Sequence, residues 1–244
     1  MSALMSTEGS VSRPNQNPME GVPSHILALL DRLHAESLAQ EAKLDKSIFI
    51  GASEGEKKAA VADKFIALDQ DKSQYLYALC RATDARTIVE AGTSYGVSTI
   101  YLALAASANV AAAGGKGTKA NVIATEYEPA KAARAREYWA ECGEAVTGAI
   151  DLREGDLLET LKENLEDVDL LLLDIWTPMA LPTLKIVQQK MRHGAIVIAD
   201  NTSDAKGYDE MLTYMRSPGS GFINLTMPFT KGLEFSVYLP KDKQ

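Results

Sequence analysis

Short runs of aliphatic and β-branched residues alternate with segments of helical periodicity from residue 87 onward. Four of these runs, TIVEAG, NVIATEYEP, DLLLLDIW and GAIVIADN, are almost continuously apolar, and each carries an acidic residue at or near its end. Continuous rather than alternating apolar runs are typical of parallel strands that helices cover on both faces. The pattern therefore predicts an α/β fold with a doubly wound, mostly parallel sheet.

The last part of the chain has a different pattern. Residues 221–240, GFINLTMPFTKGLEFSVYLP, alternate apolar and polar side chains around a turn at 230–232. They leave no room for a crossover helix, which a parallel connection would need. This segment predicts two antiparallel strands at the edge of the sheet.

The first part of the chain indicates helices. Residues 1–22 are rich in Ser, Pro, Asn and Gly and predict a disordered tail. Apolar residues at helical spacing predict an amphipathic helix within residues 23–44 and one or two more before residue 84, the last over 71–82. We expect residues 23–84 to act as a lid or dimerisation segment, although the amphipathic helix could equally pack within its own chain.

Composition and charge narrow the classes of partner. With 244 residues and 46% hydrophobic content, the chain has enough apolar surface for one sizeable core. Its net charge of −8, without a basic run, argues against nucleic acid or an anionic membrane as a partner. We expect a cytoplasmic protein, because the sequence shows neither a signal peptide nor a membrane-length apolar run, and its two distant cysteines suit a reducing compartment.

The acidic strand ends predict a ligand site. In open parallel sheets, ligands bind beyond the carboxyl ends of the strands, at the point where the strand order reverses. Glu90, Glu126, Asp174 and Asp200 end the four apolar runs. Any one of them could serve surface solubility alone, but four at equivalent positions predict a shared crevice.

The first of these runs ends in a glycine loop. Gly92 and Gly96 would let the backbone turn and approach a ligand, and a helix from about residue 97 would present free N–H groups to it. The spacing is G-x-x-x-G rather than the G-x-G-x-x-G of dinucleotide-binding loops, and Glu126 lies 30 residues beyond Gly96. Both features disfavour a nicotinamide cofactor.

Two motifs carry a resemblance to a known family. Residues 90–99 read EAGTSYGVST, which matches E-x-G-T-S-x-G-x-S-T, and residues 232–237 read GLEFSV, which matches G-x-E-x-S-V. Over residues 60–240 the chain resembles the class I S-adenosyl-L-methionine (SAM)-dependent methyltransferases, in particular the microbial small-molecule O-methyltransferases related to catechol and caffeoyl-CoA O-methyltransferases. The resemblance implies a seven-stranded Rossmann-like sheet, a SAM-binding domain over residues 85–244, and a homodimer.

The resemblance also implies a cofactor site. Glu90 and the glycine loop would hold the methionine part, Glu126 the ribose, and the segment at Asp156 the adenine, although Asp156 could simply cap a helix. Tyr95 and Trp176 could stack on adenine or substrate, or pack in the core. The implied cofactor-binding residues are Glu90, Gly92, Thr93, Ser94, Tyr95, Gly96, Ser98, Glu126, Asp156, Leu157, Asp174 and Trp176.

A metal site is a further expectation. Asp174, Asp200 and Asn201 offer hard oxygen ligands suited to Mg²⁺ or another divalent cation, and matching residues bind such an ion in metal-dependent relatives. A catechol-like substrate could chelate that ion through two oxygens. The alternative is that these residues contact cofactor or solvent and no metal binds.

From their positions in the sequence, Asp174 and Thr177 are the predicted catalytic residues. Thr177 stands near the place where relatives carry a lysine, and an alcohol is a poor base. Lys206 and Lys231 qualify as substitutes by loop position only, and none of the histidines is assigned to catalysis. Phe65 and Ile66 are expected in the lid as substrate contacts.

The leading hypothesis is a SAM-dependent O-methyltransferase for a small hydroxylated, phenolic or catechol-like molecule. One alternative is a SAM-binding protein without O-methylation activity, either another enzyme or a sensor, which Thr177 favours. The other is an NAD(P)-dependent oxidoreductase, which the loop spacing and the antiparallel end disfavour.

Overall fold

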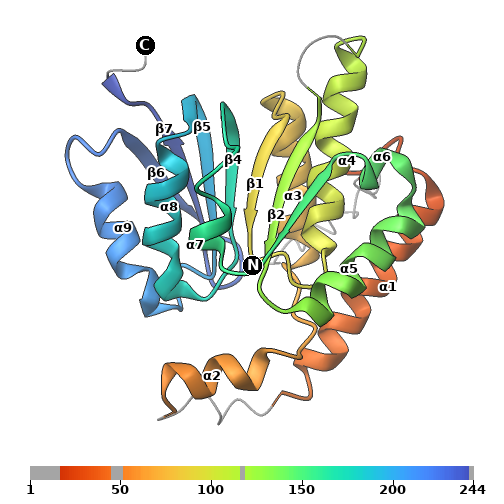
Figure 1. Ribbon diagram of the computed structural model, residues 1–244, viewed down its shortest axis with the longest axis horizontal. Helices are drawn as coiled ribbons and strands as arrows, with labels where there is room; N and C mark the ends of the chain where they lie inside the picture. Colours follow the sequence, from red (N-terminus) through yellow and green to blue (C-terminus); the bar gives the residue numbers. More distant parts are fainter. Residues whose placement is uncertain (1–16, 45–51, 116–118, 242–244) are drawn as a thin grey trace, which may run out of the picture.

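A seven-stranded sheet forms the centre of the molecule (Figure 1). The computed structural model describes residues 17–44, 52–115 and 119–241. The strand order is β3-β2-β1-β4-β5-β7-β6. The strands are β1 (Thr87–Ala91), β2 (Asn121–Glu126), β3 (Ile150–Glu154), β4 (Val168–Leu173), β5 (Met191–Asp200), β6 (Phe222–Met227) and β7 (Leu233–Tyr238).

The direction of the strands confirms the predicted fold class. β1 to β5 pair in parallel, whereas β7 pairs antiparallel with both β5 and β6. The chain turns between β6 and β7 at residues 228–232, where the alternating pattern predicted it. The strand order reverses between β1 and β4, so the carboxyl ends of these two strands mark the switch point.

Two layers of helices cover the sheet (Figure 1). Ile88 of β1 belongs to the core on one face and Val89 to the core on the other, which explains why the apolar runs are continuous. One layer contains α1 (Ser24–Glu41), α3 (Gln70–Ala82), α4 (Val97–Ala112), α5 (Pro129–Cys142) and α6 (Glu144–Thr147). The other contains α7 (Leu157–Thr160), α8 (Ala180–Gln188) and α9 (Asp209–Arg216). The remaining elements are α2 (Glu54–Val61) and two short 3₁₀ helices, η2 (Thr177–Met179) and η3 (Lys206–Tyr208).

The N-terminal helices share a core with the sheet. Leu30 and Leu33 of α1 and Leu76 of α3 are buried in the same cluster as β1. Of the two uses weighed for the amphipathic helix, the structure shows packing within its own chain, and a homodimer stays a prediction. The predicted tail is wrong at its end, because Met19 is only 4% exposed and packs into this core; residues 1–16 lie outside the described residues.

Two smaller expectations can also be compared with the structure. Cys80 and Cys142 are both free and buried, as expected of two small core residues. Within the described ranges, no helix combines the length and apolarity that crossing a membrane requires.

Candidate active site

The glycine loop joins β1 to α4 at the switch point. Gly92 and Gly96 both have positive φ, 94° and 76°. A Cβ on Gly92 would lie 2.0 Å from the carbonyl oxygen of Asp174, and one on Gly96 would lie 2.5 Å from Nε1 of Trp139. That Nε1 also donates a hydrogen bond to the Gly96 carbonyl at 2.9 Å. Close packing against the protein itself therefore requires these glycines, in addition to the ligand approach expected from the sequence.

Glu90 lies under this loop and is fully buried. Its carboxylate accepts hydrogen bonds from the hydroxyls of Thr93 at 2.9 Å, Ser98 at 2.6 Å and Thr99 at 2.5 Å. Burial raises the pKa of Glu90, and the three hydroxyl donors partly offset the rise. Glu90 thus ties the loop to the first turn of α4, and its predicted contact with the cofactor's amino group stays a prediction.

Glu126 ends β2 beside the loop. Its two carboxylate oxygens accept from the backbone N–H groups of Ser94 at 2.7 Å and Glu128 at 2.8 Å. Burial raises the pKa of Glu126. The Ser94 hydroxyl is buried beside it without a hydrogen-bond partner among the described residues. A buried orphan hydroxyl is costly, so this position fits a ligand that supplies the missing polar atom.

A short segment before α3 covers the loop. Ile66, Ala67 and Leu68 line a void of only about 10 Å³ together with the glycine loop and Asp174. The Tyr95 ring meets the Phe65 ring edge-on, with centroids 4.6 Å apart, and the Tyr95 hydroxyl donates to the backbone carbonyl of Asp63 at 3.2 Å. Ligand pockets usually measure several hundred Å³, so the segment must move to admit a cofactor.

These contacts also test the expected lid residues. Phe65 is 1% exposed and packs in the core of this structure, so its expected contact with the substrate stays a prediction. Ile66 is 38% exposed and lines the void, in keeping with a lid position.

Two carboxylates lie at the ends of the neighbouring strands. Asp174 follows β4, and no described side chain donates a hydrogen bond to it. Burial, with the nearby charges of Asp200 and Glu90, raises its pKa to about 8. Asp200 ends β5, is 5% exposed, and has its pKa raised by burial. The structure thus brings the acidic strand ends close enough to influence one another's ionisation.

A lysine that sequence reasoning missed completes this cluster. Lys72, in the first turn of α3, places Nζ 2.6 Å from Asp200 Oδ1 and 2.9 Å from Asp69 Oδ2, and its side chain is fully buried. One signal could have found it. Lys72 shares a helical face with Leu76 and Cys80, which are both buried, so it occupies a core position where a charged residue needs a partner.

The expected metal ligands lie beside a competing cation, and metal binding stays a prediction. Asp174, Asp200 and Asn201 lie at the same edge of the sheet, but the Asp200 carboxylate is already paired with Lys72. The third expected ligand, Asn201, offers only a neutral amide oxygen, and within the described residues no group of three His, Cys, Asp or Glu side chains takes its place. The donor set of this structure does not fit a divalent cation, and we derive no catalytic step through one.

Thr177 has a packing role. A Cβ on Gly207 would lie 1.8 Å from the Thr177 hydroxyl, so this side chain rests against the backbone of η3. Trp176 next to it is partly buried, and the two surface candidates for the missing base, Lys206 and Lys231, are both exposed. A catalytic role for Thr177 finds no support in these contacts.

Two other motif residues are structural in the described chain. Asp156 caps α7, accepting a hydrogen bond from the backbone N–H of Leu158 at 2.9 Å, and its expected contact with adenine stays a prediction, as does that of Leu157. Glu234 of the C-terminal motif is fully buried and binds Arg216 and the Thr226 hydroxyl. The C-terminal motif therefore fastens α9 to the antiparallel edge.

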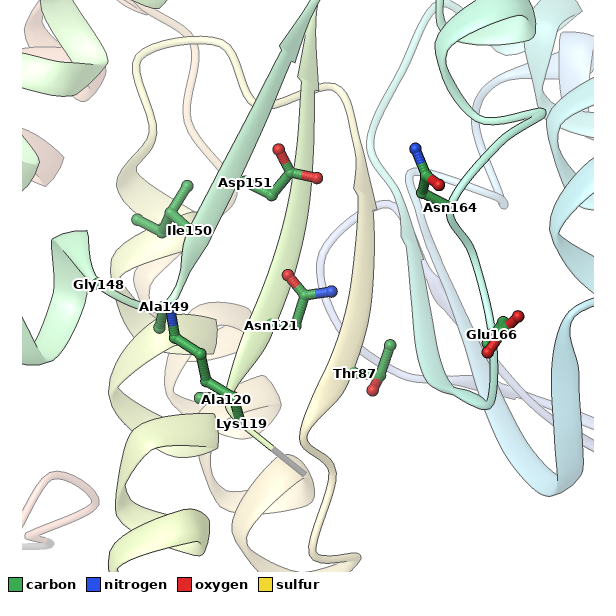
Figure 2. Close-up of a pocket in the computed structure, with 10 residues that line it drawn as sticks. All are labelled: Thr87, Lys119, Ala120, Asn121, Gly148, Ala149, Ile150, Asp151, Asn164 and Glu166. Carbon is green, nitrogen blue, oxygen red and sulfur yellow. The ribbon is translucent and has the colours of Figure 1, made fainter. Parts of the chain in front are cut away.

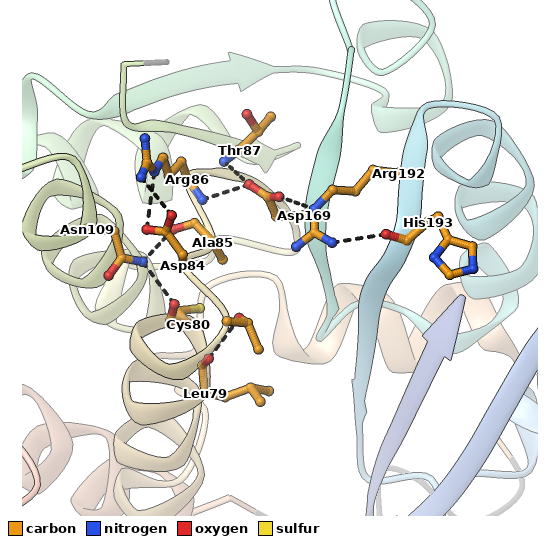
Figure 3. Close-up of polar contacts among 11 residues, drawn as sticks. Leu79, Cys80, Asp84, Ala85, Arg86, Thr87, Asn109, Asp169, Arg192 and His193 are labelled. Atoms are coloured by element: carbon orange, nitrogen blue, oxygen red, sulfur yellow. Dashed lines mark hydrogen bonds and ion pairs between the residues drawn. The ribbon is translucent and has the colours of Figure 1, made fainter. Parts of the chain in front are cut away.

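The opposite end of the sheet holds a larger hollow, about 610 Å³ in volume, lined by residues at the amino ends of β1, β2 and β3 and by the segment before β4 (Figure 2). Beside it, Asp169 accepts hydrogen bonds from the backbone N–H groups of Arg86 at 2.7 Å and Thr87 at 2.8 Å and pairs with Arg192 at 2.5 Å (Figure 3). Asp169 thus fastens β1, β4 and β5 together at their amino ends.

The sequence is similar to that of known methyltransferases. A family model described as a methyltransferase domain matches residues 89–202. A catechol O-methyltransferase from Niastella koreensis is 27% identical over 153 residues, which are 61% of this chain and 64% of that protein. One from Mycobacterium tuberculosis is 28% identical over 137 residues, 56% of this chain and 57% of that protein. The chain thus spans less than two thirds of the length of either relative.

Solved structures share the fold. A putative O-methyltransferase from Klebsiella pneumoniae superposes with a TM-score of 0.62 at 21% identity, covering 86% of this chain and 90% of that one. An O-methyltransferase from Bacillus cereus in complex with S-adenosylhomocysteine gives a TM-score of 0.60 at 19% identity, with the same coverage of each chain. A methyltransferase-domain model thus matches residues 89–202, less than half of the chain, and the solved structures show that the chain shares the Rossmann-like fold of the O-methyltransferases that it resembles.

Proposed function

We propose that the chain is a SAM-dependent O-methyltransferase that acts on a hydroxyl group of a small phenolic or catechol-like molecule. One observation carries the proposal. Within a methyltransferase domain, the glycine loop leaves the Ser94 hydroxyl buried and unpartnered beside the Glu126 carboxylate, at the switch point where ligands bind in this fold. The curated relatives, both catechol O-methyltransferases, support the choice of acceptor.

The residues of the crevice suit the charges of SAM. Glu126 has lone pairs left for the ribose hydroxyls after binding the two backbone N–H groups. The loop and the start of α4 present N–H groups to a carboxylate, because four N–H groups at a helix N-terminus lack internal partners. In their ionised forms, Asp174 and Glu90 would favour a positive charge nearby, and such a charge would in turn lower their raised pKa values. We assign the adenine to the side of Asp156, Leu157 and Trp176.

Positioning does most of the chemical work in this mechanism. When bound, SAM supplies an activated methyl group on a sulfonium. The chain has to hold the acceptor oxygen in line with that methyl group and keep water out, which accounts for much of the barrier reduction in such transfers. The segment Ile66–Leu68, which covers the loop, is the part of the chain that would exclude water.

The experiment is a transfer assay. The protein is incubated with SAM labelled in the methyl group and a panel of catechols and phenols, with and without EDTA, and labelled ether is measured. We expect transfer by the wild type and reduced transfer by Glu126→Ala at limiting SAM. S-adenosylhomocysteine binding without transfer to any acceptor would contradict the proposal and favour the second candidate, a SAM-binding protein without O-methylation activity, which Thr177 at the expected lysine position supports.

A further inference from the structure

The acidic edge of the sheet already contains a cation. Lys72 Nζ bridges Asp200 at 2.6 Å and Asp69 at 2.9 Å, and its charge acts on Asp174 as well. The lysine side chain is fully buried, whereas Asp69 is 42% exposed. A buried ammonium is costly unless it is paired and hydrogen-bonded, and these carboxylates provide the pairing.

A divalent ion would compete with this lysine for the same carboxylate. The ion expected from the sequence would need oxygens of Asp174 and Asp200, and one Asp200 oxygen already holds Lys72. A dication next to a fixed ammonium is repelled, and the repulsion is strong where burial lowers the effective dielectric constant. The geometry therefore favours one resident cation at this edge.

Resting on the proposed function, we propose that Lys72 takes the place of a divalent metal ion, so that the acceptor oxygen is bound by the charge of its ammonium group and methyl transfer does not require a metal. Lys72 lies four residues after Leu68, the last residue of the covering segment, in the first turn of α3. Its side chain is fully buried, so the proposal requires that the displacement which admits the cofactor also exposes the ammonium group.

The chemistry balances without a further reactant. An ammonium group has three N–H donors, and two of them bind Asp200 and Asp69, which leaves one for an acceptor oxygen. The acceptor releases its hydroxyl proton to water and binds as an oxyanion. Its oxygen attacks the methyl carbon, the O–C bond forms, and the electron pair of the broken S–C bond stays on sulfur. The products are a neutral ether and a neutral thioether.

This arrangement defines the class of acceptor. Metal chelation needs two adjacent oxygens, whereas one ammonium group needs a single oxyanion. We therefore expect an acceptor with one acidic hydroxyl to serve as well as a catechol. Thr177 stands near the place where relatives carry a lysine. In this chain Lys72 from α3 reaches the same edge of the sheet and would compensate for that absence.

The test compares metal binding and transfer in matched variants. Wild type, Lys72→Met, Lys72→Arg and the exposed control Lys162→Met are stripped of metal and titrated with Mn²⁺ by electron paramagnetic resonance. Each is then assayed for methyl transfer to catechol and to phenol, with EDTA or with Mg²⁺. S-adenosylhomocysteine binding by calorimetry verifies that each variant is folded.

We expect no saturable Mn²⁺ binding by the wild type and equal transfer with EDTA and with Mg²⁺, to both acceptors. Lys72→Met should bind Mn²⁺ and lose about 100-fold in kcat/KM, in the range found when one oxyanion donor is removed, while Lys72→Arg and Lys162→Met retain transfer. One Mn²⁺ per wild-type chain, EDTA-sensitive transfer, or full activity of folded Lys72→Met would overturn the proposal. An absence of transfer in every protein would instead contradict the proposed function, and the Mn²⁺ titration would still decide the role of Lys72.

Discussion

Asp169 and Asp174 lie five residues apart at opposite ends of β4, and their surroundings differ. Asp169 accepts two backbone hydrogen bonds and an ion pair with Arg192 (Figure 3). Asp174 receives no hydrogen bond from a described side chain, and its pKa is raised to about 8. Fully paired acids hold a fold together, whereas a buried acid without donors is typical of a functional site.

Judged by volume alone, the functional site would be placed at the other end of the sheet. The larger hollow, about 610 Å³, lies at the amino end, beside Asp169, whose partners are complete (Figure 2). The void at the glycine loop is only about 10 Å³, but it adjoins the unpartnered hydroxyl of Ser94 and the acidic strand ends. The position of this void at the switch point indicates the site better than its volume does, because a covering segment can close a pocket.

The largest effect should come from breaking the amino end. Asp169→Ala leaves two backbone N–H groups and Arg192 without their partner, so we expect the free energy of unfolding to fall by about 2–4 kcal/mol in urea denaturation. Asp151→Ala is the matched control. The Asp151 side chain is 49% exposed and pairs with Arg153, so we expect the loss of this pair to cost less than about 1 kcal/mol. Lost S-adenosylhomocysteine binding by folded Asp169→Ala would undermine the division between the two ends.

An intermediate effect should come from the carboxyl end. Glu126→Ala removes a charged acceptor, and we expect S-adenosylhomocysteine binding to weaken by about 1–3 kcal/mol in titration calorimetry. Glu154→Ala at the end of the adjacent β3 is the matched control, because Glu154 is exposed and pairs with Arg136 on the surface. Equal weakening in both variants would mean that Glu126 has no special role.

The smallest effect concerns pH. Asp174 has a pKa near 8 in the folded protein against 3.8 as its ordinary value, so folding favours its protonated form. Its contribution to stability is therefore full below pH 4 and is lost as the pH rises through 8. Relative to Asp174→Asn, which mimics the protonated acid, the wild type should lose about 1 kcal/mol of unfolding free energy between pH 5 and 6, since one pKa unit corresponds to ~1.4 kcal/mol. Parallel pH curves for the two proteins would show that Asp174 ionises freely.

Local patterns accounted for the sheet and its edge. The continuous apolar runs predicted parallel strands because neighbouring residues such as Ile88 and Val89 bury their side chains in opposite layers. The C-terminal segment instead alternates apolar and polar side chains. Successive side chains of a strand point to opposite faces of the sheet, so this alternation predicted strands of a different kind at the edge. Strand ends then placed Glu126, Asp174 and Asp200 at one end of the sheet.

Contacts between distant parts of the chain could not be predicted from the sequence. Lys72 and Asp200 are 128 residues apart, and the Trp139 ring that excludes a side chain at Gly96 comes from another helix. Thr177 meets Gly207 only because two loops after neighbouring strands pack together. Such pairs depend on how helices and strands pack in three dimensions, and the local pattern of apolar residues does not contain this information. The prediction of a metal site therefore could not include the ion pair between Lys72 and Asp200.

Hydrogen–deuterium exchange with and without S-adenosylhomocysteine tests the central claim, that the cofactor binds at the carboxyl ends of β1 and β4. We expect slower exchange in residues 63–68 and 92–98, which cover and form the glycine loop, and unchanged exchange in residues 148–151 and 164–169 at the amino end. Protection confined to the amino-end hollow, or no protection anywhere, would contradict the account.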